Sequence, residues 1–140
     1  MGLDLGEKTI GLAVSDTSRL IASPLELIRK SKFTHEAAHL FKLMDARKVS
    51  ALIIGLPVNM DGSEGPRAQS CRAFARNLER HRPVQVAFWD ERLSTSAVER
   101  FLIEDLDLNR KRRAQVVDRT AAAWILQGAL DRVRDQETWV

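Results

Sequence analysis

The sequence predicts an α/β domain built on a mixed sheet with helices on both faces. Two short apolar runs, residues 2–5 and 10–15, flank a glycine-containing turn, and a third extended run follows them. From residue 34 onward, helical and extended patterns alternate. An antiparallel meander followed by alternating helices and strands indicates a mixed five-stranded sheet. The length of 140 residues fits one domain, residues 1–140.

The first half of the chain contains four predicted strands and one helix. Residues 2–5 and 10–15 are strands around a turn at 6–9, and residues 24–28 form a third strand whose apolar side chains alternate. Thr34 is the expected N-cap of a helix that continues to Arg47. Residues 50–54 form a continuous apolar run, which is typical of a strand buried on both faces, and residues 55–57 end it.

The second half begins with a loop at residues 58–66, where Asp-Gly and Gly-Pro steps indicate turns. Pro66 suits the first turn of a helix that runs to about Arg82, and residues 84–89 form the fifth strand. Ser94 or Thr95 caps a helix that ends near residue 105. Residues 106–113 are predicted as a polar connection, and residues 115–134 as the last helix.

Composition narrows the functional classes only slightly. The net charge of +3 and the pI of about 9.4 are compatible with a nucleic-acid partner. A single cysteine excludes an intramolecular disulfide and suits a reducing cytosol. No apolar run approaches about 18 residues, and the start lacks the pattern of a signal peptide. We therefore expect a cytoplasmic protein that does not enter a membrane.

Several carboxylates lie where solubility does not require them. Asp4 is inside the first apolar strand, Asp90 and Glu91 end the fifth strand, and Asp118 begins the apolar part of the last helix. A buried strand rarely tolerates a charge unless that charge is paired or binds a metal ion. If these carboxylates converge, a divalent cation that prefers oxygen ligands, Mg²⁺ or Mn²⁺, is the natural compensation.

Each carboxylate other than Asp4 also has a structural interpretation. Asp118 suits the first turn of a helix, where the macrodipole favours an acidic side chain. Asp90 could accept backbone N–H groups in the turn after its strand, and Glu91 could form a surface ion pair with Arg92. Because side chains alternate along a strand, Asp90 and Glu91 face opposite sides of the sheet, and only one of them reaches the site directly.

Three segments in order, and the end of the chain, resemble one known family. They are LDLGEKTIGLAVSD at residues 3–16, IGLPVNMDGSEGPRA at 54–68, DERLST at 90–95 and VDRTAAAWILQ at 117–127. Together they resemble the YqgF (RuvX) family, described both as pre-16S rRNA nucleases and as Holliday junction resolvase homologues. The resemblance covers nearly the whole chain, and the middle segment is the most specific.

The resemblance implies an RNase H-like fold in a bacterial cytoplasm and metal-dependent hydrolysis of phosphodiester bonds. It also implies a role in trimming the ends of precursor 16S ribosomal RNA during ribosome biogenesis. The acidic site of the family falls on Asp4, Glu91 and Asp118, which would hold Mg²⁺ or Mn²⁺, and Asp90 is a fourth catalytic candidate. In a two-metal reaction, one ion activates a water and the other stabilises the leaving oxygen.

Substrate contacts are expected from polar and basic side chains near these carboxylates. Helix N-termini and Lys or Arg side chains bind phosphates, and the basic run at residues 110–113 is a good phosphate track. The candidates are Lys8, Asn59, Arg67, Arg92, Lys111 and Arg112. Two departures from the family matter: Thr9 replaces a residue that is often basic, and the chain begins close to Asp4.

The sequence leaves several functions open. A resolvase-type DNA endonuclease shares the fold, the metals and the carboxylates, but it needs a symmetric dimer to cut two strands. An actin-like or sugar-kinase ATPase needs two lobes, and 140 residues supply one. A non-catalytic nucleic-acid-binding module does not need three acidic residues. The expected partner is precursor rRNA, with single-stranded or branched DNA as the alternative, and the expected state is a monomer or a weak homodimer.

Overall fold

The computed structural model describes the backbone of residues 1–93 and 110–137, and the side chains of residues 1–93 and 121–134. The predicted third helix, at residues 94–105, lies outside the described part. The elements in chain order are β1 Gly2–Leu5, β2 Thr9–Ser15, β3 Ala22–Arg29, α1 Phe33–Ala46, β4 Ala51–Leu56, α2 Pro66–His81, β5 Gln85–Asp90, the short 3-10 helix η1 Glu91–Leu93, and α4 Arg110–Glu137.

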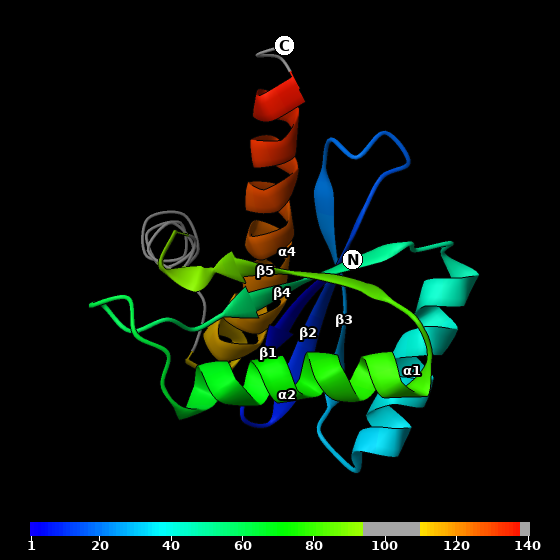
Figure 1. Ribbon diagram of the computed structural model, residues 1–140, viewed down its shortest axis with the longest axis vertical. Helices are drawn as coiled ribbons and strands as arrows, with labels where there is room; N and C mark the ends of the chain where they lie inside the picture. Colours follow the sequence, from blue (N-terminus) through cyan, green and yellow to red (C-terminus); the bar gives the residue numbers. More distant parts are fainter. Residues whose placement is uncertain (94–109, 138–140) are drawn as a thin grey trace.

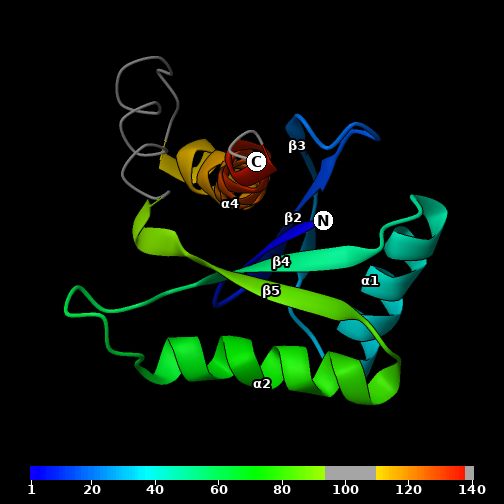
Figure 2. The ribbon, with the colours of Figure 1, turned by 45° about the horizontal axis from the view of Figure 1, so that its top comes forward.

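The five strands form one mixed sheet in the order β3-β2-β1-β4-β5. Strand β1 is central: it pairs antiparallel with β2 and parallel with β4, and β5 extends the parallel half. Helices α1 and α2 cover one face, and α4 crosses the other (Figures 1 and 2). This arrangement confirms the predicted mixed five-stranded sheet with helices on both faces.

Alternation along β1 divides its side chains between the two faces. Leu3 is fully buried in the core beneath α1 and α2. Gly2 faces α4, because a Cβ atom there would lie 2.8 Å from the Ala122 carbonyl oxygen and 2.8 Å from the Leu126 Cβ. Asp4 follows Gly2 by two residues and therefore lies on the α4 face. The close packing of α4 against the central strand thus depends on small residues, Gly2 on β1 and Ala122 on α4.

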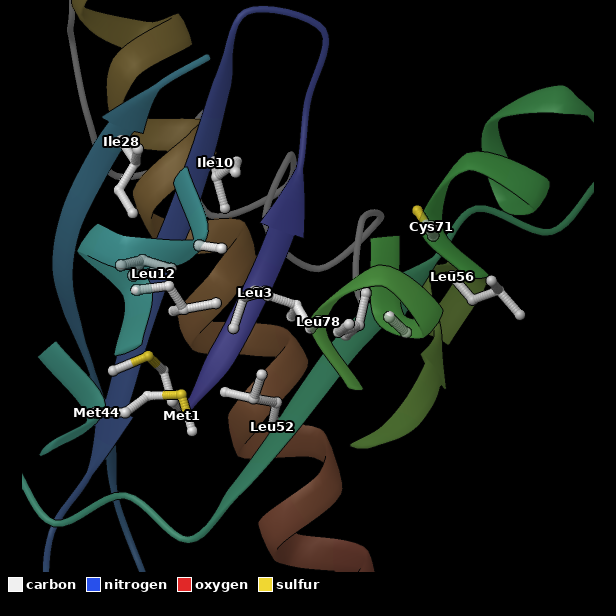
Figure 3. Packing of buried hydrophobic residues seen from close by; sticks show 14 of the residues in the cluster. Met1, Leu3, Ile10, Leu12, Ile28, Met44, Leu52, Leu56, Cys71 and Leu78 are labelled. Carbon is white, nitrogen blue, oxygen red and sulfur yellow. The ribbon is translucent and has the colours of Figure 1, made fainter. Parts of the chain in front are cut away.

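The larger core fills the space between the sheet and the helices α1 and α2. Leu3, Leu12 and Leu52 come from three adjacent strands and are fully buried. Met1 and Met44 lie beside them (Figure 3). The continuous apolar run of β4 suits a strand covered on both faces, as the sequence predicts.

Several element boundaries differ from the predictions. The final helix begins at Arg110 rather than at residue 115, so the expectation of a polar connection is wrong for residues 110–113. Lys and Arg are good helix formers, and a polar composition alone does not exclude a helix. Thr34 does not cap α1: Lys32 holds the N-cap position, without a side-chain capping bond. Strand β4 continues through Leu56 rather than ending at residue 54.

Among the described residues, no helix has the length and apolarity needed to cross a lipid bilayer.

Candidate active site

The carboxyl groups of Asp4 and Glu91 meet on the α4 face of the sheet. Phe88 packs into the core beneath α2, whereas Trp89 lies against Gly128 of α4. Glu91 comes two residues after Trp89 and reaches the α4 face as well. There its carboxyl group shares a hydrogen bond with that of Asp4. The parallel strands β1, β4 and β5 thus bring together two acidic side chains that are 87 positions apart.

Gly55 makes room for this pair. It lies on β4, between β1, which carries Asp4, and β5, which Glu91 directly follows. A Cβ atom at this position would lie 2.5 Å from the Glu91 Oε1 atom and 2.5 Å from the Ile125 Cδ1 atom. Both distances are well below van der Waals contact, so a side chain at this position would displace the Glu91 carboxyl group and the Ile125 Cδ1 methyl group. The glycine therefore lets Glu91 pass across β4 beneath α4.

Glu91 holds its proton more firmly than an ordinary glutamic acid. Burial raises the pKa of Glu91 above its usual 4.5, and the Asp90 charge raises it further, while the hydrogen bond with Asp4 and the charge of Arg67 act in the opposite direction. Two acidic groups this close cannot both ionise at low cost, because their charges repel. Either a shared proton or a cation must therefore compensate them.

This shift predicts a pH dependence of stability in metal-free protein. The proton on Glu91 stabilises the folded state fully below pH 4.5, and this stabilisation is lost as the pH rises through the higher folded pKa. Glu91→Gln has no titrating group at this position. Its free energy of unfolding, relative to that of the parent, should therefore increase as the pH rises across this window. Urea denaturation in chelator over a pH series measures the difference. Parallel pH profiles would contradict the assignment.

Asp90 occupies a different environment from Glu91. The Arg92 guanidinium donates to both oxygens of the Asp90 carboxylate, with an Nη2–Oδ2 distance of 2.6 Å, and the Arg92 backbone N–H also donates to it. This contact holds the pKa of Asp90 below its usual value. The structure therefore places Asp90 in an ion pair, where it caps the turn after β5, and it does not join Asp4.

Arg92 connects that ion pair to the loop between β4 and α2. Its Nη1 atom donates to the carbonyl oxygens of Asn59 and Met60, at 3.3 and 3.4 Å. Within the loop, the Asn59 amide donates to the Ser63 hydroxyl, which donates to Asp61. Two of the predicted substrate contacts, Asn59 and Arg92, thus help to hold this loop in place.

Arg67 and Lys8 remain available to a ligand. Arg67 lies in the first turn of α2, is exposed, and forms no ion pair with any described residue. Its charge nevertheless acts on Glu91. Lys8 is exposed in the turn between β1 and β2.

The remaining predicted residues lie in the first part of α4. Asp118 belongs to this helix, seven positions before Ile125, and Lys111 and Arg112 belong to its first turn. The side chains of all three lie outside the described part of the chain. Among the side chains that are described, no group of three His, Cys, Asp or Glu residues gathers to hold a metal ion.

Cys71 of α2 lies near the carboxyl pair, on the other face of the sheet. Burial raises the pKa of its thiol to about 11, and the charges of Glu91 and Asp4 contribute to this shift. At pH 8 we expect about one thiol in a thousand to be ionised, because ionisation falls tenfold for each unit between pH and pKa. Native protein should therefore react with Ellman's reagent far more slowly than protein unfolded in urea. Equal rates would contradict the burial.

Comparison with known proteins places this chain in a family. A family model described as "RuvX: Holliday junction resolvase" matches residues 1–132. The chain belongs to the RuvX family. A relative from Phenylobacterium zucineum, named "Putative pre-16S rRNA nuclease", is 66% identical over 96% of this chain and 87% of its own length. One with the same name from Paracoccus denitrificans is 64% identical over 95% of this chain and 84% of its own length.

A solved structure supports the fold expected of the RuvX family. T. thermophilus RuvC in complex with Holliday junction substrate superposes with a TM-score of 0.58, covering 96% of this chain and 94% of that chain. The sequence identity is 14%, so the likeness concerns the fold alone. It confirms the RNase H-like architecture that the sequence resemblance implies.

The positions of Gly55 and Ile125 in the candidate site of this RuvX member were not predicted from the sequence. One signal could have identified Gly55: it is a glycine at the end of a long apolar run. Glycine weakens a strand, so its presence there often indicates that another group packs closely against the backbone. No comparable signal exists for Ile125, an apolar residue on the apolar face of a helix.

Proposed function

We propose that this protein is a metal-dependent nuclease that hydrolyses phosphodiester bonds and processes the ends of precursor 16S rRNA. The observation that carries the proposal is the pair of half-buried carboxyl groups, Asp4 near the end of β1 and Glu91 directly after β5, which lie beside each other. The names of the relatives at 64–66% identity support rRNA as the substrate.

The chemistry of this pair fits a divalent cation. Carboxylate oxygens are the ligands that Mg²⁺ and Mn²⁺ prefer, and two carboxyl groups that lie together repel each other unless a cation or a proton compensates their charge. We propose Asp4, Glu91 and Asp118 as the ligands. When bound, such an ion supplies a water of lowered pKa and neutralises charge on the phosphate.

The other residues of the site have separate proposed roles. Arg67 is an exposed cation at the start of α2, and it would attract and orient a phosphate near the carboxyl pair. Lys8 would contact the nucleic-acid backbone from the β1–β2 turn. Arg92 and Asn59 would hold the loop against β5, which keeps the strand end and Glu91 in place. Lys111 and Arg112 would supply further phosphate contacts from α4.

A cleavage assay in Mg²⁺ or Mn²⁺ tests the proposal. We expect release of product from single-stranded RNA that carries the 16S precursor end, and no product in excess chelator. Four-way junction DNA serves as the second substrate, because the family description and the fold of RuvC favour a resolvase as the alternative function. Cleavage of the junction alone would favour the resolvase, and cleavage of neither substrate would favour a binding module.

A further inference from the structure

A buried carboxylate, Glu36 of α1, faces a hollow that the proposed reaction does not use. Glu36 is 7% exposed, and no other charged side chain in the described part of the chain is as deeply buried. Its Oε2 atom accepts the Ser31 N–H at 2.9 Å. No described residue bonds to Oε1, and every fully buried side-chain N or O atom in the described part has a partner. Oε1 therefore keeps some exposed surface, and Glu36 is one of the residues that line the hollow.

The hollow has an apolar wall and a polar rim. Its volume is about 200 Å³, and Leu5 and Phe74 supply apolar surface. Lys30, Arg67 and the Ser70 hydroxyl lie around it, and neither cation forms an ion pair with a described residue. Pockets for drug-sized molecules usually measure about 300–1,000 Å³. This hollow is smaller, and it suits a single ring system with hydrogen-bonding groups at its edge.

The hollow lies near the carboxyl pair, on the other face of the sheet at the end of β1. Leu5 directly follows Asp4 and, by alternation, faces the opposite side of the sheet. Cys71, which also lines the hollow, responds to the charges of both Asp4 and Glu91. A nucleic-acid strand held at the carboxyl pair can therefore place a neighbouring nucleotide at the mouth of the hollow.

We propose that this hollow receives one unpaired nucleobase that carries an exocyclic amino group, next to the phosphate that is cleaved; the proposal rests on the proposed nuclease function. The amino group donates to the open Glu36 oxygen, and the ring lies against Phe74 and Leu5. Lys30 and Arg67 face the flanking phosphates. Single-stranded bases are recognised in this way, by stacking and by hydrogen bonds to their edges.

The carboxylate determines which bases fit. A glutamate accepts a hydrogen bond from the amino group of cytosine, whereas uracil presents a carbonyl oxygen at the same position and would leave the carboxylate unsatisfied. The hollow thus favours cytosine over uracil, two bases of nearly equal size. A bare phosphate does not explain the site, because the buried Glu36 carboxylate would repel it.

Equilibrium binding of oligo(C) and oligo(U) of equal length, measured in chelator so that nothing is cut, tests the proposal. The parent should bind oligo(C) about tenfold more tightly than oligo(U). Glu36→Gln should abolish most of this preference. Ser70→Leu, which fills the hollow from an exposed position, should abolish it too, while Gln69→Leu on the same turn of α2 should leave it intact.

Equal binding of both oligonucleotides by the parent would overturn the proposal, as would a preference that survives in both Glu36→Gln and Ser70→Leu. Thermal melting shows whether each variant is folded. If Glu36→Gln does not fold, Ser70→Leu still tests the proposal, because Ser70 is exposed. Failure of the nuclease function is recognised separately: in that case the parent prefers oligo(C) but cuts no RNA in Mg²⁺ or Mn²⁺.

Discussion

Asp4→Asn is expected to reduce the rate of RNA cleavage by about 10²–10³-fold, without loss of folded protein. The change keeps the shape of the side chain and removes the negative charge that the ion requires. A bound ion contributes several kcal/mol of charge stabilisation to the transition state, which corresponds to a factor of this size. Single-turnover cleavage at saturating Mn²⁺ measures the effect. Thermal melting should show equal or higher stability, because the variant no longer places two acidic groups side by side.

Asp45→Asn is the matched control. Asp45 is an exposed carboxylate that forms an ion pair with Arg82 at 2.7 Å, on α1 and far along the chain from the site residues. Removing its charge should leave the cleavage rate within about twofold, because exposed ion pairs contribute little free energy and none of it to the reaction. If Asp4→Asn cuts as fast as Asp45→Asn, Asp4 is not a ligand.

Gly55→Ala should have the second largest effect, on both stability and activity. The added methyl group would overlap Glu91 Oε1 and Ile125 Cδ1, each at 2.5 Å. All the atoms that it would overlap belong to side chains, so Glu91 and Ile125 must move aside to make room for it. We expect a loss of about 1–3 kcal/mol in the free energy of unfolding, as for other overpacked cores. Displacement of Glu91 should also lower the cleavage rate of the protein that remains folded.

Gly65→Ala distinguishes this effect from a general cost of replacing glycine. Gly65 precedes α2, and the nearest atom to an added Cβ would be the Asn59 Nδ2 atom at 3.5 Å, an ordinary contact. Its stability should change by less than about 1 kcal/mol. If Gly55→Ala melts like Gly65→Ala and retains full activity, the packing of Glu91 against Gly55 is not important.

The sequence was sufficient to predict the mixed sheet and to single out Asp4 as a candidate site residue. The Asp4 carboxylate within a strand has no structural explanation as a cap or a turn, and this made it the leading candidate. The alternation of β5 predicted that only one of Asp90 and Glu91 reaches the site, but not which one. That depends on where the strand ends. The structure ends β5 at Asp90, directs Glu91 to Asp4, and pairs Asp90 with Arg92.

Other parts of the site depend on tertiary contacts that a single sequence does not reveal. The role of Gly55 follows from the approach of Glu91 and Ile125, which belong to distant segments. The hollow at Glu36 needs α1, α2 and the β1–β2 turn together. The basic run at residues 110–113 looked like a loop because it is polar, but Lys and Arg also favour helices, and α4 includes it.

The central claim is that the Asp4–Glu91 pair binds a metal ion. The most direct test is a Mn²⁺ titration of the parent and of Asp4→Asn, in which electron paramagnetic resonance measures the free ion. This measurement needs neither substrate nor turnover. We predict that the parent binds Mn²⁺ and that Asp4→Asn binds it at least about tenfold more weakly, as expected when one ligand of an ion is removed. Parent binding should also strengthen as the pH rises, since the ion displaces the proton held by Glu91. Equal affinity in the two proteins would contradict the assignment of the Asp4–Glu91 pair as the metal site.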